Sequence, residues 1–200
     1  MKPTVSILIS GRGSNMEALA SACDSKVIPA NVGVVISNIA DAPGLDRAAG
    51  FGIPTAVVPH AGRSKAAFEA DLQAILKHYK TDIICLAGFM RILSADFVNL
   101  WEGRILNIHP SLLPDFAGTN VYARTLAAGV RESGCTVHRV TAEVDSGDIL
   151  VQSRVPVRAG DTESTLAERI LQAEHVAYPQ ALAMLVSQLA AKPHPERKVS

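Results

Sequence analysis

The sequence has no surplus of either charge and no long hydrophobic run. Lys and Arg together number 19, and so do Asp and Glu, which gives a formal net charge of zero at neutral pH. Nucleic acids and anionic lipid surfaces attract basic proteins, so neither is expected as a partner. No apolar run approaches the roughly 20 residues that a membrane-spanning helix requires. The sequence therefore predicts a protein without a nucleic-acid or membrane partner.

Cysteine is also scarce. The three cysteines stand far apart in apolar surroundings, at positions 23, 85 and 135, and form no C-x-x-C pair. The apolar run at the N-terminus is too short, and glycine follows it too soon, for a secretory signal. We therefore expect a cytoplasmic protein with reduced, buried thiols, none of which has the sequence context of a catalytic nucleophile.

Apolar residues are abundant, at 48% of the 200 residues, which is enough to build a packed core. Continuous apolar runs are typical of strands that are buried on both faces of a parallel sheet. Such runs alternate here with helical patterns, which predicts an α/β fold with an open, doubly wound, mostly parallel sheet of Rossmann-like type. The predicted strands are 5–10, 32–37, 55–58, 82–87 and 104–108, and the predicted helices are 14–22, 45–51, 64–79, 94–101 and 121–128.

The C-terminal part of the chain departs from this alternation. Two strand patterns, 135–141 and 149–157, are joined by only a few residues and must run antiparallel to each other. A helical pattern follows from 163 to about 190, with a kink or break expected at Pro179. Because no repeat, linker or composition break interrupts the chain, we expect a single domain over residues 1–190 and a frayed tail over 191–200.

A glycine-rich turn separates the first predicted strand from the first predicted helix. It spans residues 10–15 (SGRGSN), and its last amides would point at an anion from the carboxyl edge of the sheet. A dinucleotide fingerprint would have a third glycine where Met16 stands, and no Gly-Lys-Ser/Thr follows as in an NTPase P-loop. The glycines either bend the chain into a capped helix or, as we favour, form a monophosphate site.

Polar residues that could take part in catalysis stand at the end of the predicted strand 104–108 and just after it, in the segment 107–114 (NIHPSLLP). Strand alternation places Asn107 and His109 on the same side. An amide donor beside an imidazole suits acyl transfer, in which an oxyanion needs donors and a leaving nitrogen needs a proton. Asp145, in the turn between the last two strands, would favour a charged imidazole at His109 if the two met. Taken alone, each of the three is better explained as a structural loop or turn residue, and only their combination favours a chemical role.

Three further groups of residues carry weaker signals. A metal ion could recruit His109, His138 and Asp145, but they include no closely spaced ligand pair, so no metal is expected. His138 lies in the middle of a predicted strand and is interpreted as a satisfied core or sheet-face histidine. The segment 89–93 (FMRIL) could line an apolar ligand slot, although core packing with one snorkelling arginine is the simpler explanation.

Taken together, these motifs resemble those of the phosphoribosylglycinamide formyltransferases, a folate-dependent family of purine synthesis. The resemblance runs from about residue 5 to residue 189 and rests on several segments: ISGRGSN at 9–15, LAGFMRIL at 86–93, LNIHPSLLP at 106–114, GCTVH at 134–138, EVDSG at 143–147 and AEH at 173–175. Other formyltransferases and hydrolases of 10-formyltetrahydrofolate share the NxHPSLLP motif. The glycine turn and the length of 200 residues favour the phosphoribosylglycinamide formyltransferases.

The resemblance implies a reaction and a set of roles. The enzyme would transfer the formyl group of its co-substrate 10-formyltetrahydrofolate to the amine of 5′-phosphoribosylglycinamide in de novo purine synthesis, without a metal. Asn107, His109 and Asp145 match the family's catalytic trio. Residues matching the phosphate and ribose site are Gly13, Ser14, Asn15 and Glu174, and those matching the folate site are Lys65, Met90, Arg91, Ile92, Leu93, Asn107, Thr141, Ala142, Glu143, Val144 and Asp145.

Alternative functions stay open, and one residue departs from the family pattern. A 10-formyltetrahydrofolate hydrolase would use the same trio on water, a related formyltransferase would act on another amine, and a nucleotide-binding regulator would leave the trio without a role. The regulatory domain of such hydrolases and the extra C-terminal domain of methionyl-tRNA formyltransferases are not expected here. Tyr122 stands in the segment where relatives usually carry a histidine. The sequence does not determine the oligomeric state, and a homodimer is one option.

Overall fold

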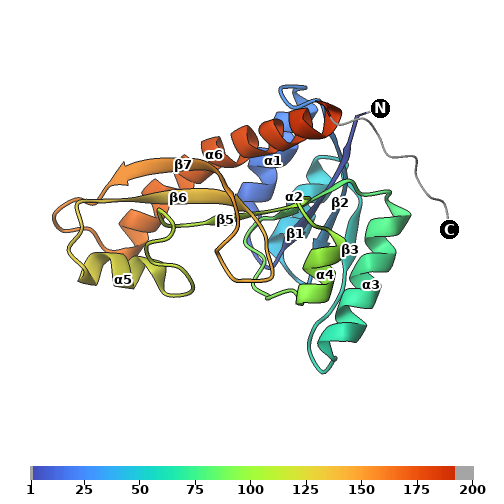
Figure 1. The fold of residues 1–200 in the computed structure, drawn as a ribbon, viewed down its shortest axis with the longest axis horizontal. Helices are drawn as coiled ribbons and strands as arrows, with labels where there is room; N and C mark the ends of the chain where they lie inside the picture. Colours follow the sequence, from blue (N-terminus) through green and yellow to red (C-terminus); the bar gives the residue numbers. More distant parts are fainter. Residues whose placement is uncertain (1, 192–200) are drawn as a thin grey trace.

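Strands and helices follow one another along the chain in the predicted order (Figure 1). The structure, a computed structural model, describes residues 2–191. The predicted frayed tail therefore lies outside the described residues, apart from its first residue, which ends the last helix. The elements are β1 (Thr4–Ile9), α1 (Ser14–Asp24), β2 (Asn31–Ser37), α2 (Pro43–Gly50), β3 (Thr55–Val57), α3 (Lys65–His78), β4 (Ile83–Leu86), α4 (Ala95–Leu100), β5 (Ile105–His109), α5 (Val121–Ala127), β6 (Glu132–Arg139), β7 (Ile149–Pro156) and α6 (Glu163–Ala191).

The sheet confirms the predicted α/β class. Its strands lie in the order β3-β2-β1-β4-β5-β6-β7, and all pairs from β3 to β5 are parallel. The last two strands are antiparallel to each other, as predicted, and β6 is also antiparallel to β5. The chain moves outward from β1 to β3 and then returns to place β4 on the other side of β1. Strand order therefore reverses between β1 and β4, and ligands bind at such a point in doubly wound sheets.

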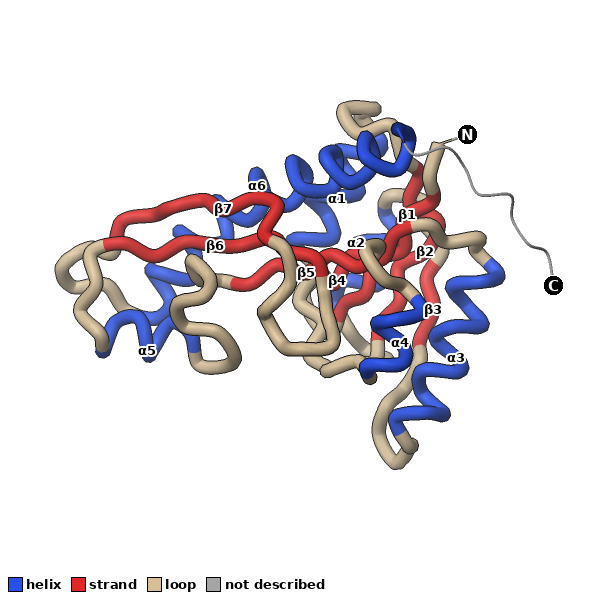
Figure 2. The backbone as a smooth tube through the Cα atoms, in the orientation of Figure 1, coloured by secondary structure: helices blue, strands red, loops and turns tan. Residues whose placement is uncertain are grey.

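Helices cover both faces of the sheet, as Figures 1 and 2 show for α1 and α6 on one side and α3 and α4 on the other. Successive residues of β1 point to opposite faces: Ile7 and Ile9 belong to the core beneath α1 and α6, and Leu8 belongs to the core beneath α3 and α4. All three are fully buried. Burial on both faces explains why this strand is apolar throughout.

A kink or break was expected at Pro179, and the break is wrong: α6 continues through this residue as one helix of 29 residues. Proline removes one backbone hydrogen bond from a helix, which destabilises it. The burial of apolar side chains in the same part of α6 offsets this loss of stability. Tyr178, Ala181 and Leu182 are all fully buried. The Tyr178 hydroxyl also lies 3.1 Å from the carbonyl oxygens of both Leu86 and Leu106, so it ties α6 to the neighbouring strands β4 and β5.

No helix among residues 2–191 is long and apolar enough to cross a membrane.

Candidate active site

Loops from four parts of the chain meet at the carboxyl edge of the sheet. The backbone N–H of Met90, after β4, donates a hydrogen bond to Ser10 Oγ, after β1, at 2.8 Å. The N–H of Gly118, after β5, donates to Asp145 Oδ2, between β6 and β7, at 2.9 Å. This edge includes the point where strand order reverses. The predicted catalytic residues and the glycine turn therefore share the ligand-binding edge of the sheet.

His109 and Asp145 lie beside each other although 36 positions separate them in the chain. Asp145 Oδ2 is 3.4 Å from His109 Nδ1, and each side chain is only 8% exposed. On the other side of the ring, His109 Nε2 lies 3.1 Å from the carbonyl oxygen of Phe116, which can only accept a hydrogen bond. Both ring nitrogens thus face oxygen acceptors, an arrangement that suits the doubly protonated, positively charged imidazole.

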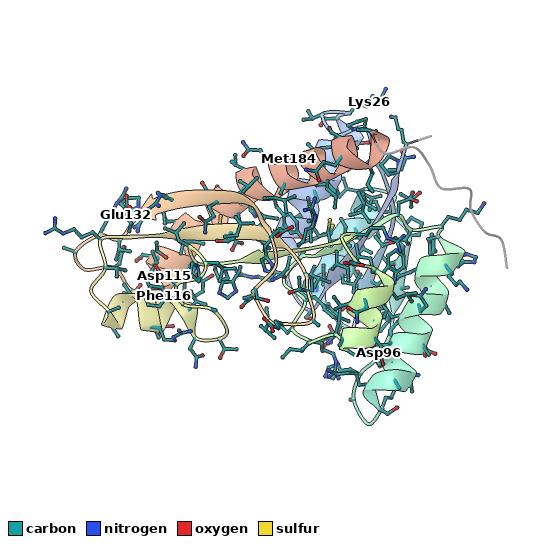
Figure 3. All side chains as sticks on the ribbon, viewed as in Figure 1. Lys26, Asp96, Asp115, Phe116, Glu132 and Met184 are labelled. Carbon is teal, nitrogen blue, oxygen red and sulfur yellow. The ribbon has the colours of Figure 1, made fainter. Side chains whose placement is uncertain are left out.

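The loop between β5 and α5 holds this arrangement in place. Phe116 lies close to α5 (Figure 3), where the Arg124 guanidinium carbon is 5.7 Å from the centroid of its ring. Arg124 also donates to the Ala117 carbonyl oxygen at 2.7 Å. The Gly118 N–H fixes the Asp145 carboxylate, so the loop positions both members of the ion pair.

His138 is a site residue that the sequence interpretation missed. It is buried, as expected, but β6 pairs it directly with Asn107 on β5, and its Nε2 is 3.2 Å from Asn107 Nδ2. His138 Nδ1 lies 2.9 Å from the Arg139 carbonyl oxygen and must therefore carry a proton. In the neutral ring Nε2 is then a free acceptor for one Asn107 N–H. The second N–H of Asn107 stays available for a ligand.

The charge state of His138 follows from its surroundings. Burial lowers the pKa of His138 below its ordinary value, and the His109 ring adds to this effect, while the Arg139 carbonyl and Asp145 oppose it. Asp145 Oδ1 lies 3.6 Å from His138 Nε2. Asp145 therefore stands between two imidazoles of different character, a buried ring that favours the neutral form and the His109 ring, which faces two acceptors.

Because the folded-state pKa of His138 is lowered, we expect His138 to make stability depend on pH. The unfolded chain takes up the proton first, at a pKa of about 6.5, so this contribution to stability is lost as the pH falls through that value. Replacing His138 with Gln should flatten the pH dependence of the free energy of unfolding between about pH 7.5 and 5.5. Urea unfolding at several pH values measures this, and an equal pH dependence in both proteins would contradict the assignment.

The glycine turn joins β1 to α1 at the same edge of the sheet. Gly13 has φ 77°, in the left-handed region, and a Cβ there would lie 2.8 Å from Gly44 Cα. Glycine is therefore required both by conformation and by space. The turn lines a hollow of about 260 Å³ together with Ala87, Gly88 and Met90, the first residues after β4. This geometry fits a small anionic group at the start of α1.

Asn15 and Glu174 connect this turn to α6. Asn15 Nδ2 donates to Glu174 Oε2 at 2.7 Å, and both residues are buried. Burial raises the pKa of Glu174, and the hydrogen bond from Asn15 opposes that shift. Tyr122, on α5, is close enough to Glu174 for the carboxylate to raise its pKa, which burial and this charge together bring to about 12. Tyr122 is therefore a neutral phenol near Glu174.

Apart from Asn107 on β5, the residues predicted for folate lie on two loops and at the start of α3. Met90, Ile92 and Val144 expose 78%, 66% and 57% of their surface, which makes them apolar groups available to a ligand. Leu93, in contrast, is 8% exposed and belongs to the core beneath α3 and α4. Lys65 is the exposed first residue of α3. The loop that holds the remaining residues, Thr141, Ala142, Glu143 and Asp145, is braced by hydrogen bonds from the Thr141 and Ser146 hydroxyls to the Glu143 carbonyl.

Neither the thiols nor a metal cluster offers another site. All three cysteines are free and buried, and burial raises the pKa of Cys23 to about 11 and that of Cys135 to about 12. The reactive thiolate is therefore disfavoured. Although His109, His138 and Asp145 come together, residues 2–191 contain no group of three His, Cys, Asp or Glu side chains that could hold a metal ion.

Known proteins with similar sequences include formyltransferases and larger proteins of purine biosynthesis. The model of the formyl transferase family matches residues 4–182. The phosphoribosylglycinamide formyltransferase of Escherichia coli is 45% identical over 174 residues, which cover 86% of this chain and 82% of that protein. The trifunctional purine biosynthetic protein adenosine-3 of Bos taurus is 49% identical over 93% of this chain, which spans only 18% of the length of that protein.

Solved structures show the same relationship. Glycinamide ribonucleotide transformylase 1 from Symbiobacterium toebii superposes with a TM-score of 0.91 at 44% identity, covering 94% of this chain and 89% of that one. A formyltetrahydrofolate deformylase from Pseudomonas syringae also superposes, with a TM-score of 0.88, but it is 26% identical and the match covers 62% of its chain. The fold is thus common to transferases and to a deformylase, while sequence identity is higher with the transferases.

Proposed function

The chain belongs to the formyl transferase family, and on that basis we propose that it transfers the formyl group of 10-formyltetrahydrofolate to the amine of 5′-phosphoribosylglycinamide. The products are tetrahydrofolate and the formylated nucleotide of de novo purine synthesis. The observation that carries the proposal is the position of the anion-accepting turn 10–15 and of the cluster of Asn107, His109 and Asp145 at one sheet edge. A metal-free reaction, a cytoplasmic location, small-molecule partners and a homodimer belong to the same proposal.

Asn107 and His109 stabilise the oxyanion that forms during transfer. The neutral substrate amine attacks the formyl carbon, and the formyl oxygen becomes an alkoxide. The Asn107 N–H that His138 does not hold donates to this oxygen. The charged His109 ring stabilises it electrostatically, and direct donation from Nε2 requires exchange of its hydrogen bond with Phe116. In this kind of catalysis, most of the rate enhancement comes from hydrogen-bond donors that are held in place before the charge develops.

Asp145 serves the proton transfers. The attacking nitrogen loses a proton, N10 of the folate gains one, and the bond between the formyl carbon and N10 then breaks. We assign the movement of the proton to Asp145, directly or through a water molecule. One of its oxygens is held by the Gly118 N–H and faces His109, and the other lies 3.6 Å from His138 Nε2. Its negative charge also maintains the positive charge on the His109 ring.

The two substrates occupy opposite sides of this cluster. The amides of Gly13, Ser14 and Asn15 bind the 5′-phosphate, and Glu174 accepts hydrogen bonds from the ribose hydroxyls. The exposed apolar side chains of Met90, Ile92 and Val144 suit the flat ring system of the folate. Holding both reactants in reacting geometry removes much of the entropic barrier of a two-substrate reaction.

Turnover of 10-formyltetrahydrofolate should therefore depend on the nucleotide. We expect the absorbance change of the folate to appear when 5′-phosphoribosylglycinamide is added and to be absent when the same ribonucleotide without its glycyl amine is used. The measurement requires only purified protein and both substrates. Folate turnover at an equal rate without the nucleotide would contradict the proposal and would favour the hydrolase alternative.

A further inference from the structure

The segment 88–94, between β4 and α4, is held at both ends by polar side chains from other parts of the chain. Near its start, the N–H of Met90 donates to Ser10 Oγ at 2.8 Å, and the Ser10 hydroxyl in turn donates to Asn38 Oδ1 at 2.6 Å. At its end, the N–H and the hydroxyl of Ser94 donate to Glu69 Oε1 and Oε2, each at 2.6 Å. The segment is thus fixed at two points while Met90 and Ile92 between them stay exposed.

Glu69 is the stronger of these two anchors. It lies on α3, is 9% exposed, and uses both carboxylate oxygens on the same residue. Ser94 is also the N-cap of α4, because its Oγ accepts from the Phe97 N–H at 3.1 Å. Hydrogen bonds to a carboxylate are short and strong, and breaking them leaves a buried charge without partners. The carboxylate therefore determines where segment 88–94 ends and where α4 begins.

Phe68, the neighbour of Glu69 on α3, contacts the same segment through its aromatic ring. The Phe68 ring stacks on Phe89 at 6.4 Å between centroids, and the Arg91 guanidinium carbon lies 5.3 Å from the centroid of Phe68. Phe89 and Arg91 are thus held against α3, while Met90 and Ile92 stay exposed. A ligand surface of this kind is most effective when its backbone is fixed before binding.

We propose that Glu69 is a positioning residue for the formyl donor: through Ser94 it fixes segment 88–94 in the conformation that receives the folate. This inference rests on the proposed function. Glu69 acts through another residue, since both of its oxygens are occupied by Ser94. Its removal should weaken productive binding of 10-formyltetrahydrofolate more than binding of the nucleotide. Ser10 still holds the start of the segment beside the glycine turn, and Asn15 and Glu174 still join α1 to α6.

Steady-state kinetics of Glu69→Ala with both substrates test the inference. We expect the KM for 10-formyltetrahydrofolate to rise about tenfold, which corresponds to about 1.4 kcal/mol. The KM for the nucleotide should stay within about twofold of the wild-type value, and kcat should change less than the folate KM. Glu69→Gln should restore part of the loss, because an amide oxygen can still accept from the Ser94 N–H.

The chain offers a matched control on the same pair of helices. Gln73 lies one turn further along α3, and its Oε1 accepts from Trp101 Nε1 at 2.8 Å, at the opposite end of α4. Gln73→Ala thus removes a hydrogen bond between α3 and the end of α4 without touching segment 88–94. We expect the folate KM of this variant to stay at the wild-type value. Equal increases in the two variants would mean that Glu69 only packs the helices together, and would overturn the inference.

Amide hydrogen exchange gives a second readout that does not depend on turnover. Exchange over residues 88–94 should be faster in Glu69→Ala than in the wild-type protein or in Gln73→Ala. Unchanged exchange together with an unchanged folate KM would overturn the inference while the wild-type protein still transfers the formyl group. If the wild-type protein transfers no formyl group, the proposed function fails, and unchanged exchange would then overturn the positional role as well.

Discussion

Replacing Asn107 with alanine should lower kcat by on the order of 10²–10³. The side chain has one N–H that His138 does not use, and we place the developing oxyanion at that donor. A hydrogen bond that strengthens only as charge develops affects kcat far more than the binding of the folate. The measurement is the steady-state rate with both substrates saturating, accompanied by the dissociation constant of tetrahydrofolate, which should change little.

The same substitution also leaves His138 without its donor, so a second variant separates the two effects. His138→Gln can still accept from Asn107 through its amide oxygen, and it should retain much more activity than Asn107→Ala. Asn31→Ala, at an exposed asparagine at the start of β2, serves as a neutral control. A folded Asn107→Ala protein with the wild-type kcat would reduce Asn107 to a structural residue of β5.

Replacing Asp145 with asparagine should also lower kcat at neutral pH by at least a hundredfold, within the range for lost acid–base catalysis. The substitution removes the carboxylate that lies 3.4 Å from His109 Nδ1 and to which we assign the movement of the proton. The amide oxygen can still accept from the Gly118 N–H, so the loop should keep its conformation. The measurement is the steady-state rate at neutral pH with both substrates saturating.

Two measurements distinguish this effect from loss of structure. Circular dichroism and urea unfolding should show that Asp145→Asn folds cooperatively, as the wild-type protein does. Asp148→Asn is the matched control, because this carboxylate lies in the same turn but is exposed and pairs with Arg139. A folded Asp145→Asn protein with the same kcat as Asp148→Asn would contradict the role of Asp145 in the reaction.

The class of fold could be predicted because the burial of a strand determines which of its residues are apolar. A strand such as β1, buried on both faces, must be apolar at nearly every position, and this pattern is visible without any knowledge of pairing. The continuity of α6 through Pro179 could not be predicted in the same way. It depends on how tightly Tyr178 and Leu182 pack against the rest of the core, which is tertiary information.

The site could be predicted only as far as local motifs reach. The turn before α1 and the Asn-x-His-Pro segment combine special backbone conformations with chemically useful side chains within a few residues. The role of His138 depends instead on the register between β5 and β6, and a shift of one residue would turn it to the other face. Glu69 and Asn38 act across the chain on segment 88–94, at separations of 25 and 28 positions from their partners, so no local pattern indicates them.

The fate of a labelled formyl group tests the central claim most directly. The protein is incubated with 10-formyltetrahydrofolate carrying ¹³C in the formyl group and with 5′-phosphoribosylglycinamide, and the carbon is followed by NMR. We expect the label to appear in the formamide of the nucleotide, one formyl group for each tetrahydrofolate released, and to be lost with Asn107→Ala. Appearance of the label as free formate, at a rate that the nucleotide does not change, would contradict the account.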